Sequence, residues 1–593
     1  MKKFLLCFIP YCTPHFPGAA IPSLVSQLRN NNYDVSVMDL NIDFLYTVYT
    51  KEYLQSAIEK AENQYKDLLM KKESFYAKGN TYENDILSQK YDILDSFFNE
   101  HKELGERIPS SIEKALQVFR NEDLFYNLKL LQYASQVVQY ANKVACLPFA
   151  PFDFYSSYVK KYKDLCEIIF DKNQNIYMEY FEGKINEIKN LNPDYVGVSI
   201  ADRQQVIPGL TLCYLLKKHT NAHVNIGGNF FSRVLDSIST YENFFELFAD
   251  SVSYAEGENS IIELAKYIDG EIDISQVPQL VYKDKQTNEI IQTPIGKPVD
   301  LTSIYPPDYI DFDLSKYFSP EPKLPLQIQR GCYWCKCAFC DFPFGKTFSL
   351  KPVKSIIEEI KYNKEKHNVS MYLIVDEAVR PEYLKELADE ILANNLKISF
   401  TIQLRFEEEF DYKLLKKLYD AGLHSIWWGF ESASPRLLKL INKGINVDTA
   451  KRIIVDADKA GILNVVYTMS GFPTETPDEL LETLNFLTEY EKHICVNPPN
   501  DFYLTRQSYI FNHPEKFNIR ILEEQPDLTP MVDFERLDEG IDNVLKSQKL
   551  IDDFTEKYKG INDPQRFPRA YVTYFVNKYG LDYVKKNILG IKE

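Results

Sequence analysis

Apolar and polar positions in the first half of the chain alternate between short apolar runs and longer stretches of helical period. Runs of strand length, bounded by turn residues, occur at 4–10, 34–40, 195–200, 223–228 and 250–255. Stretches with apolar residues at helical spacing follow several of them, and 206–219 is the clearest. Strands that alternate with helices predict a parallel, doubly wound α/β sheet, which binds its ligand at the carboxyl ends of the strands.

The segment from about residue 48 to 189 interrupts this alternation. It is rich in Tyr, Phe and charged residues, has a helical period and shows few strand signals. We therefore expect a helical insertion within the first domain. A stripe of aromatic side chains at helical spacing is more often a core than a binding face, so the stripe by itself identifies no site.

Strand and helix alternate again in the second half of the chain. Apolar runs at 326–329, 371–375, 399–404, 425–430 and 465–470 are separated by helical stretches. This pattern predicts a βα barrel or part of one, with its chemistry at the carboxyl ends of the strands. The predicted parts are a doubly wound domain (1–275), a connector with a hairpin near 280–291 (276–320), a partial barrel (321–490) and a small α-rich C-terminal region over the barrel mouth (491–593).

The balance of charge limits the classes of partner. Among 593 residues, 68 are basic and 85 acidic, which gives a formal net charge of −17. A protein whose main partner is a nucleic acid shows a basic footprint, so this class is disfavoured. No apolar run is long enough to span a bilayer. The N-terminus resembles a signal peptide for a few residues, but Pro10 and Pro14 interrupt it, so we interpret it as a buried strand and expect a cytoplasmic protein.

Four of the ten cysteines lie close together, at Cys332, Cys335, Cys337 and Cys340. A large cytosolic protein does not need disulfides, so such a group indicates metal binding or redox chemistry. The group directly follows a predicted strand, and we therefore expect it in a loop at the carboxyl end of that strand.

Zinc and iron–sulfur sites are the two alternatives for this group. Two Cys-x2-Cys pairs are present, but only one residue separates them. A structural zinc site normally places a dozen or more residues between its pairs, so that both can surround one ion. Iron–sulfur clusters use thiolates at close spacing, and the spacing here favours them.

The run QRGCYWCKCAFC at 329–340 resembles the cluster loop of radical S-adenosylmethionine (SAM) enzymes, which is normally Cys-x3-Cys-x2-Cys. The best match is Cys332-x4-Cys337-x2-Cys340, one residue longer, as is familiar among cobalamin-dependent members of that family. Cys332, Cys337 and Cys340 are then the catalytic metal ligands. Cys335 takes the usual position of a glycine and is expected not to bind iron.

The resemblance implies a [4Fe-4S] cluster and SAM as cofactors. In that family one iron is chelated by the amino and carboxylate groups of SAM, and an electron from the cluster cleaves SAM to a 5′-deoxyadenosyl radical. Such chemistry needs a strongly reducing cluster, which thiolate ligation can supply. The resemblance also implies an external electron donor such as flavodoxin or ferredoxin.

The ends of later barrel strands resemble the segments that hold SAM in the same family. Asp376 and Glu377 are acceptors suited to the SAM ammonium group, and Glu431 could accept hydrogen bonds from the ribose. A carboxylate after a strand is more often a helix cap, but the recurrence of such groups at successive strand ends favours a site. The expected SAM-binding residues are Asp376, Glu377, Gln403, Arg405, Glu431, Ser432 and Gly471.

The first domain resembles the flavodoxin-like cobalamin-binding domain that precedes many radical SAM domains. Glycines would let the backbone approach the corrin or its nucleotide tail. The expected cobalamin-binding residues are Ser199, Gly227, Gly228 and Glu256. The alternative is a doubly wound domain that has lost its ligand.

A histidine of the first loop falls near a known motif. Many cobalamin domains supply a histidine below cobalt from an Asp-x-His-x-x-Gly loop, and the sequence here is Thr13-Pro-His15-Phe-Pro-Gly18. Carboxylates orient metal-bound histidines, and Thr13 replaces that carboxylate. We therefore expect a loop or surface histidine at His15 and not a cobalt ligand.

The resemblance implies a methyltransferase that acts on an unactivated carbon of a peptide or natural product. Two alternatives remain: cyclisation, rearrangement or cross-linking with the same cofactors, and a cobalamin- or redox-sensing binding protein. Transfer-RNA methylthiolation is disfavoured, because neither a further N-terminal cysteine set nor a basic C-terminal module is apparent. Candidates for substrate contact are Trp428, Tyr503, Arg506 and Tyr509.

Overall fold

The computed structural model describes most of the chain in two compact units. The described residues are 2–77, 88, 91–92, 94–95, 98–99, 161–172, 175–341, 348–537, 540–558 and 569–591. The first unit comprises residues 1–14, 20–295 and 311–320, and the second comprises 15–19, 296–310 and 321–593. No described helix is long and apolar enough to cross a lipid bilayer.

The first unit is built on a sheet in the order β2-β1-β3-β4-β5-β6-β7. The first five strands of this order are parallel, and β6 and β7 are antiparallel. Their bounds are β1 Lys3–Phe8, β2 Asp34–Asp39, β3 Tyr195–Ser199, β4 His223–Gly227, β5 Ser251–Ser253, β6 Leu280–Lys283 and β7 Ile290–Gln292. The order of the parallel strands is that of flavodoxin-like sheets, so the predicted fold class is confirmed.

The hairpin expected in a connector is part of this sheet. Residues 280–283 and 290–292 pair with each other and with β5, so the first sheet continues into the segment that the sequence pattern assigned to a connector. A short strand such as β5 would leave its ladder groups unpaired at the sheet edge, and the hairpin pairs them.

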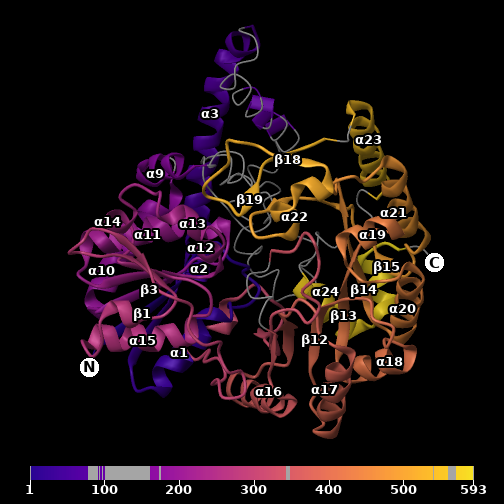
Figure 1. Cartoon of the computed structure of the whole chain (residues 1–593), viewed down its shortest axis with the longest axis horizontal. Coiled ribbons are helices and arrows are strands. Elements are labelled where there is room, and N and C mark those ends of the chain that lie inside the picture. The colour runs from indigo at the N-terminus through magenta and orange to yellow at the C-terminus, as the bar shows by residue number, and fades with distance from the viewer. Residues whose placement is uncertain are drawn as a thin grey trace. The chain divides into compact units, whose positions relative to one another are not determined.

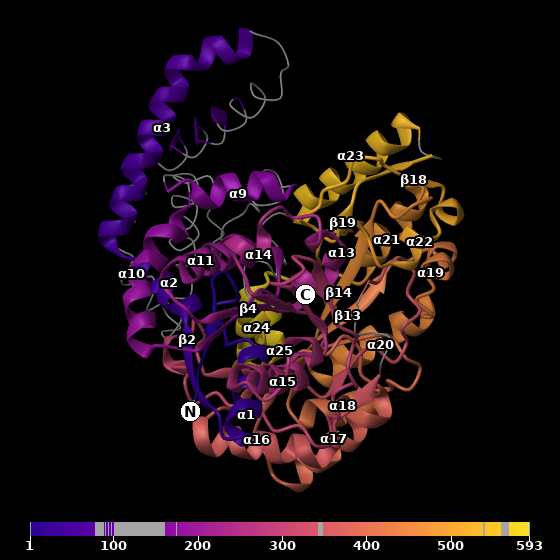
Figure 2. The ribbon, with the colours of Figure 1, turned by 60° about the vertical axis from the view of Figure 1, so that its left-hand side comes forward.

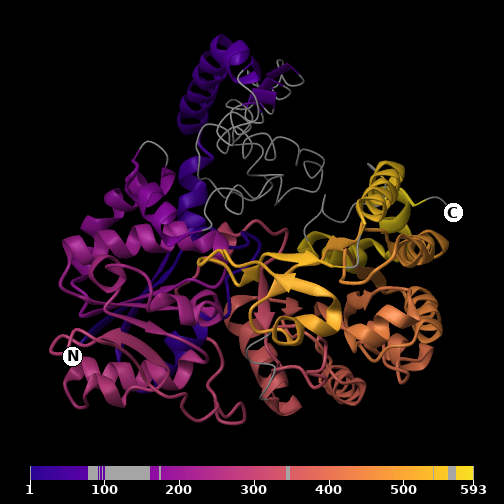
Figure 3. The same cartoon turned by 45° about the horizontal axis from the view of Figure 1, so that its top comes forward.

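Helices cover both faces of the first sheet (Figures 1 and 3). On one face α1 (Ala20–Asn30) packs beside α15 (Gly257–Asp269), and on the other α10 (Ile176–Leu191) packs beside α11 (Val206–His219). Two faces of covering helices explain why the parallel strands are apolar on both sides.

The described parts of the predicted insertion are helical. The insertion begins where α2 (Leu40–Val48) ends, and its described helices are α3 (Lys51–Ala77), α9 (Tyr162–Phe170) and α10. Figure 2 shows α3 as a long helix that extends away from the sheet of the first unit. Residues 100–160 of the predicted insertion lie outside the described residues.

The second unit is built on a row of parallel strands in the order β8-β11-β12-β13-β14-β15, and β16 also pairs with β14. The bounds are β8 Lys323–Leu326, β11 Met371–Ile374, β12 Ser399–Leu404, β13 Leu423–Glu431, β14 Leu463–Ser470, β15 Ile494–Cys495 and β16 Asn500–Asp501. The order follows the chain, and the row ends at β8 and β15 without pairing them. This is the topology of a partial βα barrel.

Helices connect the strands of the partial barrel, and local signals start several of them. They are α16 Val353–His367, α17 Pro381–Ala393, α18 Tyr412–Asp420, α19 Pro435–Ile441, α20 Val447–Ala460 and α21 Pro477–Glu489. Thr476 and Glu479 form a capping box at the start of α21, and Pro477 occupies its first turn.

The C-terminal region is divided between two places in the second unit. Helix α23 (Ile541–Tyr558) packs on α21, whereas α24 (Arg569–Tyr579) packs on β12 and β13. The Thr573 hydroxyl lies 3.0 Å from that of Ser425, which donates to Thr401 at 2.6 Å. Part of the region expected to cover the barrel mouth therefore lies against the strands themselves.

Candidate functional site

The cysteine loop follows β8 and β9 (Gln329–Arg330), and β9 pairs with β10 (Ser349–Leu350). Cys332 and Cys337 are half-buried, while Cys335 and Cys340 are exposed. The Cys340 N–H donates to the Cys337 carbonyl at 3.3 Å, so these two cysteines share a turn. The loop lies at the carboxyl end of the first strand of the partial barrel, as the sequence pattern indicated.

Asp376 holds the start of this loop. Its carboxylate accepts hydrogen bonds from the backbone N–H groups of Ile328 at 2.8 Å and Gln329 at 3.1 Å. Burial raises the pKa of Asp376 to about 7, although the two backbone N–H groups lower it. The structure thus gives Asp376 a supporting role behind the loop, whereas the neighbouring Glu377 is exposed.

Arg405 lies against the aromatic residues of the loop. Its guanidinium is 3.9 Å from the ring centre of Trp334 and 5.6 Å from that of Tyr333. Nη2 donates to the Lys443 carbonyl at 2.7 Å, and Nε is 3.4 Å from a carboxylate oxygen of Glu407. Arg405 is only 4% exposed. The sequence pattern placed Arg405 at a strand end but gave no sign of these aromatic contacts.

A buried ion pair lies beside Arg405. Lys443 Nζ is 2.7 Å from Glu431 Oε1, and both side chains are buried. Gly429 makes room for this pair, because a Cβ there would lie 2.7 Å from Lys443 Nζ. Burial raises the pKa of the Cys337 thiol, while the Lys443 ammonium and the Arg405 guanidinium lower it. Lys443 was not among the expected residues, because a lysine in a helix–helix connection carries no signal of burial.

The remaining expected SAM-binding residues differ in their surroundings. The Ser432 hydroxyl is buried, lies 3.2 Å from that of Thr483 and accepts the Ser434 N–H at 3.1 Å, which supports the turn before α19. Gly471 is exposed with a φ of 75°, and a Cβ there would meet nothing within 4 Å. Gln403 is half-buried on β12, two residues before Arg405.

These residues fit an iron–sulfur cluster with SAM. The donor set is three thiols on one loop, and the cationic groups of Arg405 and Lys443 act on the thiol of Cys337. Cations stabilise anionic thiolates. Arg405 Nη1 is buried and has no hydrogen-bond partner among the described residues, so a cationic donor remains for a ligand. Within the described ranges no three His, Cys, Asp or Glu side chains surround one point as ligands of a single metal ion.

The four expected substrate contacts differ in their exposure and in their hydrogen-bond partners. Trp428 is fully buried, stacks on Phe406 and donates to Asn464 at 2.8 Å, so its prediction as a substrate contact is wrong. Tyr503 and Tyr509 are exposed. Arg506 bonds the backbone carbonyls of Thr529 and Pro526, which fixes its own loop.

In the first unit, Ser199 and Gly227 are register partners at the carboxyl ends of β3 and β4. A Cβ on Gly227 would meet nothing within 4 Å, so this strand end is open. Gly228 has a φ of 103°, and a Cβ there would overlap the Ile200 carbonyl, so its glycine is required by packing. Glu256 precedes α15, and its carbonyl accepts from Gln279 Nε2 at 2.6 Å.

His15 belongs to the second unit. It is 8% exposed and packs edge-on against Tyr571 of α24, with ring centres 5.4 Å apart. The expectation of a loop residue is confirmed, and that of a surface residue is wrong.

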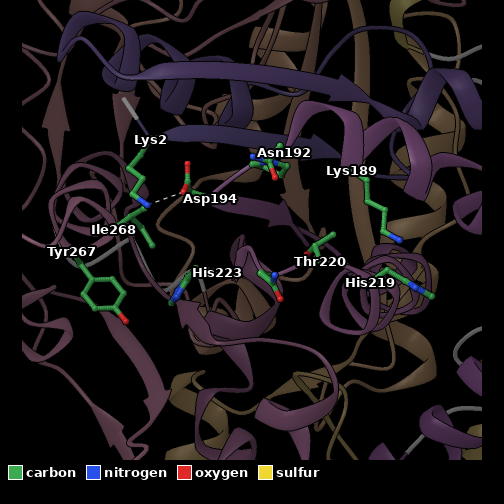
Figure 4. Close-up of a pocket in the computed structure, with 11 residues that line it drawn as sticks. Lys2, Lys189, Asn192, Asp194, His219, Thr220, His223, Tyr267 and Ile268 are labelled. Carbon is green, nitrogen blue, oxygen red and sulfur yellow. Dashed lines mark hydrogen bonds and ion pairs between the residues drawn. The ribbon is translucent and has the colours of Figure 1, made fainter.

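A polar hollow of about 510 Å³ lies at the amino ends of the first sheet (Figure 4). Lys2 Nζ donates to the Asp194 carboxylate at 2.8 Å, and the same carboxylate accepts the Lys3 N–H at 2.9 Å. Burial lowers the pKa of His223, at the start of β4, to about 4. These contacts join strand starts, whereas ligands of such sheets bind at the other edge.

A family model described as the radical SAM superfamily matches residues 326–487. The match covers less than half of the chain and includes the whole row of barrel strands from β11 to β14. The matched radical SAM domain begins at the last residue of β8, includes the cysteine loop and extends into α21. It confirms the resemblance of the loop, and a radical SAM domain implies a [4Fe-4S] cluster and SAM.

Two relatives with known names share part of the chain. An uncharacterized methyltransferase of Pyrococcus horikoshii is 27% identical over 307 residues, which are 50% of this chain and 65% of the relative. An anaerobic magnesium-protoporphyrin IX monomethyl ester cyclase of Rubrivivax gelatinosus is 25% identical over 252 residues, 41% of this chain and 45% of the relative. The chain thus spans less than two thirds of either relative.

A solved structure resembles this chain beyond the matched domain. The methyltransferase TsrM of Kitasatospora setae, solved with cobalamin and a [4Fe-4S] cluster bound, aligns with a TM-score of 0.55 and 14% identity. The alignment covers 89% of this chain and 82% of TsrM. At this identity the likeness establishes a shared fold.

Proposed function

We propose that this protein is a cobalamin-dependent radical SAM methyltransferase that adds a methyl group to an unactivated carbon of a peptide or natural product. The observation that carries the proposal is the cysteine loop of the radical SAM domain in a chain that also has a flavodoxin-like unit. The name of the Pyrococcus relative and the fold shared with TsrM support it. A cytoplasmic location and a flavodoxin or ferredoxin donor go with this proposal.

In this proposal Cys332, Cys337 and Cys340 hold the cluster, and Cys335 does not. Such a cluster supplies the electron that cleaves SAM, and cobalamin carries the methyl group. Asp376 keeps the loop in place through the backbone of Ile328 and Gln329. The strong neighbouring cations compensate the negative charge of the thiolates.

Arg405 binds the carboxylate of SAM in this proposal, because its buried Nη1 has no hydrogen-bond partner among the described residues. A guanidinium recognises a carboxylate through charge-assisted hydrogen bonds. Glu377 is exposed near the start of the loop and can accept from the SAM ammonium. Gln403, Glu431 and Gly471 surround the same strand ends.

Ser199 and Gly227 form the proposed cobalamin edge of the first unit, since Gly227 leaves open space at the end of β4. Glu256 lies at the next loop of the same sheet. Gly228 follows Gly227 at the same strand end and keeps the turn after β4 against Ile200.

A second candidate keeps the same cofactors but closes a ring, rearranges or cross-links the substrate without adding a methyl group. The named cyclase of Rubrivivax gelatinosus favours it. The mass of the product separates the two, because each methylation adds one CH₂ and the second candidate adds none.

The test is anaerobic reconstitution of the full chain with iron, sulfide, cobalamin and SAM, followed by addition of a strong reductant. Cobalt content, 5′-deoxyadenosine and S-adenosylhomocysteine are measured on one sample. Bound cobalt with both products supports the methyltransferase. If 5′-deoxyadenosine is the one product formed, the second candidate is favoured. If neither product forms although the cluster is intact, the proposal is overturned and a sensing protein is favoured.

A further inference from the structure

The end of α19 presents three consecutive carbonyl groups to the site. The Ile441 carbonyl accepts the Ala338 N–H at 2.8 Å, and the Asn442 carbonyl accepts from Trp334 Nε1 at 2.8 Å. The third carbonyl, that of Lys443, accepts from Arg405 Nη2 at 2.7 Å. The last carbonyls of a helix have no partner within the helix, so the cysteine loop and Arg405, which directly follows β12, provide the partners here.

The partly buried Trp334 ring lies against the same segment. Gly444 has a φ of 69°, and a Cβ on it would overlap Cη2 and Cζ2 of Trp334. Arg405 stacks 3.9 Å from the centre of the ring. The indole N–H and the cation–π contact therefore hold the ring in place, and Gly444 leaves room for the ring because it has no side chain.

Two residues of the cysteine loop, Trp334 and Ala338, donate hydrogen bonds to the end of α19. They lie in the two intervals between the proposed cluster ligands. Trp334 lies between Cys332 and Cys337, in the interval that has one residue more than the usual motif. Ala338 lies between Cys337 and Cys340, and its carbonyl also accepts the Ile510 N–H at 3.1 Å. Each interval of the loop is thus tied to the end of α19.

We infer that residues 441–444 are a positioning segment that sets how the three thiols of the cysteine loop stand relative to one another. Trp334 and Gly444 are the positioning residues. The inference rests on the proposed function, in which these thiols hold a cluster. Because the potential of such a cluster depends on hydrogen bonds and exposure around it, a displaced loop changes the spectrum and potential as well as the stability of the loop.

Two variants and one control test the inference on the full-length chain. Trp334→Phe removes the indole N–H and keeps most of the ring, and Gly444→Ala puts a methyl group into the space of the ring. Gly590→Ala is the control, because Gly590 has a φ of 67° and a Cβ there meets nothing within 4 Å. This control has the same conformational cost of an alanine at positive φ, but its methyl group does not overlap another side chain.

The first measurement is amide hydrogen exchange of the apo protein, read in peptides that contain Ala338. Exchange rises about fivefold in Trp334→Phe, the factor that one lost hydrogen bond gives, and about tenfold or more in Gly444→Ala. It stays at the wild-type rate in Gly590→Ala. Peptides from β3 and β4 show that the first unit is folded in every variant.

The second measurement, after reconstitution, is iron per chain, the electron paramagnetic resonance spectrum of the reduced cluster and its midpoint potential. Trp334→Phe and Gly444→Ala shift the spectrum and the potential, and Gly590→Ala shifts neither. Unchanged exchange, or faster exchange with an unchanged spectrum and potential, overturns the inference. A wild-type chain that takes up no iron overturns the proposed function itself, and the inference with it.

Discussion

The cysteine loop of the second unit and the open strand ends of the first unit represent two kinds of proposed site. The loop is defined by chemistry that side chains carry, with thiols beside the cations of Arg405 and Lys443. The edge at Ser199 and Gly227 is defined by space that the backbone leaves. A site of the first kind can be recognised from residue types and spacing, whereas a site of the second kind depends on how strands are ordered.

The largest effect is expected when the thiols of the cysteine loop are removed one at a time, which tests whether side-chain chemistry defines that site. Cys332→Ser, Cys337→Ser and Cys340→Ser should each lose nearly all cluster iron after reconstitution, because a thiolate ligand is lost. Cys335→Ser should keep the iron of the wild type, since Cys335 is not a proposed ligand. Iron and sulfide analysis checks this, and equal loss in Cys335→Ser would show that the ligand set is wrong.

The cationic part of the loop site is tested next. Arg405→Gln should weaken SAM binding about 10- to 100-fold, because a hydrogen bond to a charged group contributes about 1.5–3 kcal/mol. Equilibrium binding to the reconstituted protein measures it. Arg520→Gln, at an exposed ion pair with Glu535, is the control and should bind SAM as the wild type does. Equal affinity in both variants would remove Arg405 from the SAM site.

Substitutions at the neighbouring residues Gly227 and Gly228 test the proposed cobalamin edge of the first unit. Gly228→Ala should destabilise the first unit by about 3 kcal/mol, because its Cβ would overlap the Ile200 carbonyl at a φ of 103°. Gly227→Ala should change stability by less than about 0.5 kcal/mol, because its Cβ meets nothing within 4 Å.

Cobalamin retention in the same two variants decides the role of Gly227. A several-fold loss of affinity in Gly227→Ala, without loss of stability, is expected if the corrin occupies the open space. Cobalt analysis after gel filtration measures it. Full retention in Gly227→Ala would place the corrin elsewhere.

The last prediction concerns the pH dependence of the support that Asp376 gives to the cysteine loop. Burial raises the pKa of Asp376 from 3.8 to about 7, so the folded protein keeps a proton that the unfolded chain releases between these values. The stability of the second unit should therefore fall as pH rises from about 4 to 7, by up to about 1.4 kcal/mol per pH unit. Asp376→Asn should lose this part of the slope.

Denaturant unfolding of the apo protein at several pH values measures the slope. Asp389→Asn is the matched control, because Asp389 lies on α17 at the surface, where it pairs with Lys417 of α18; this variant should keep the wild-type slope. If Asp376→Asn also keeps it, Asp376 is ionised in the folded protein.

The sequence alone determined the alternation of strands and helices, the class of both units and the cysteine spacing, because these depend on local periodicity and on residues close together in the chain. It placed Arg405 and Glu431 at strand ends for the same reason. It could not show that Asp376 bonds the backbone of another strand end, or that Ser432 supports a turn.

Only the tertiary structure decided which distant residues meet. The hairpin at 280–292 joins the first sheet because β5 has an edge to pair, which no local pattern reports. Lys443 and Gly444 appear in the sequence as an ordinary connection between helices. They reach the cysteine loop because α19 ends beside it, where its carbonyl groups need donors and Trp334 needs room.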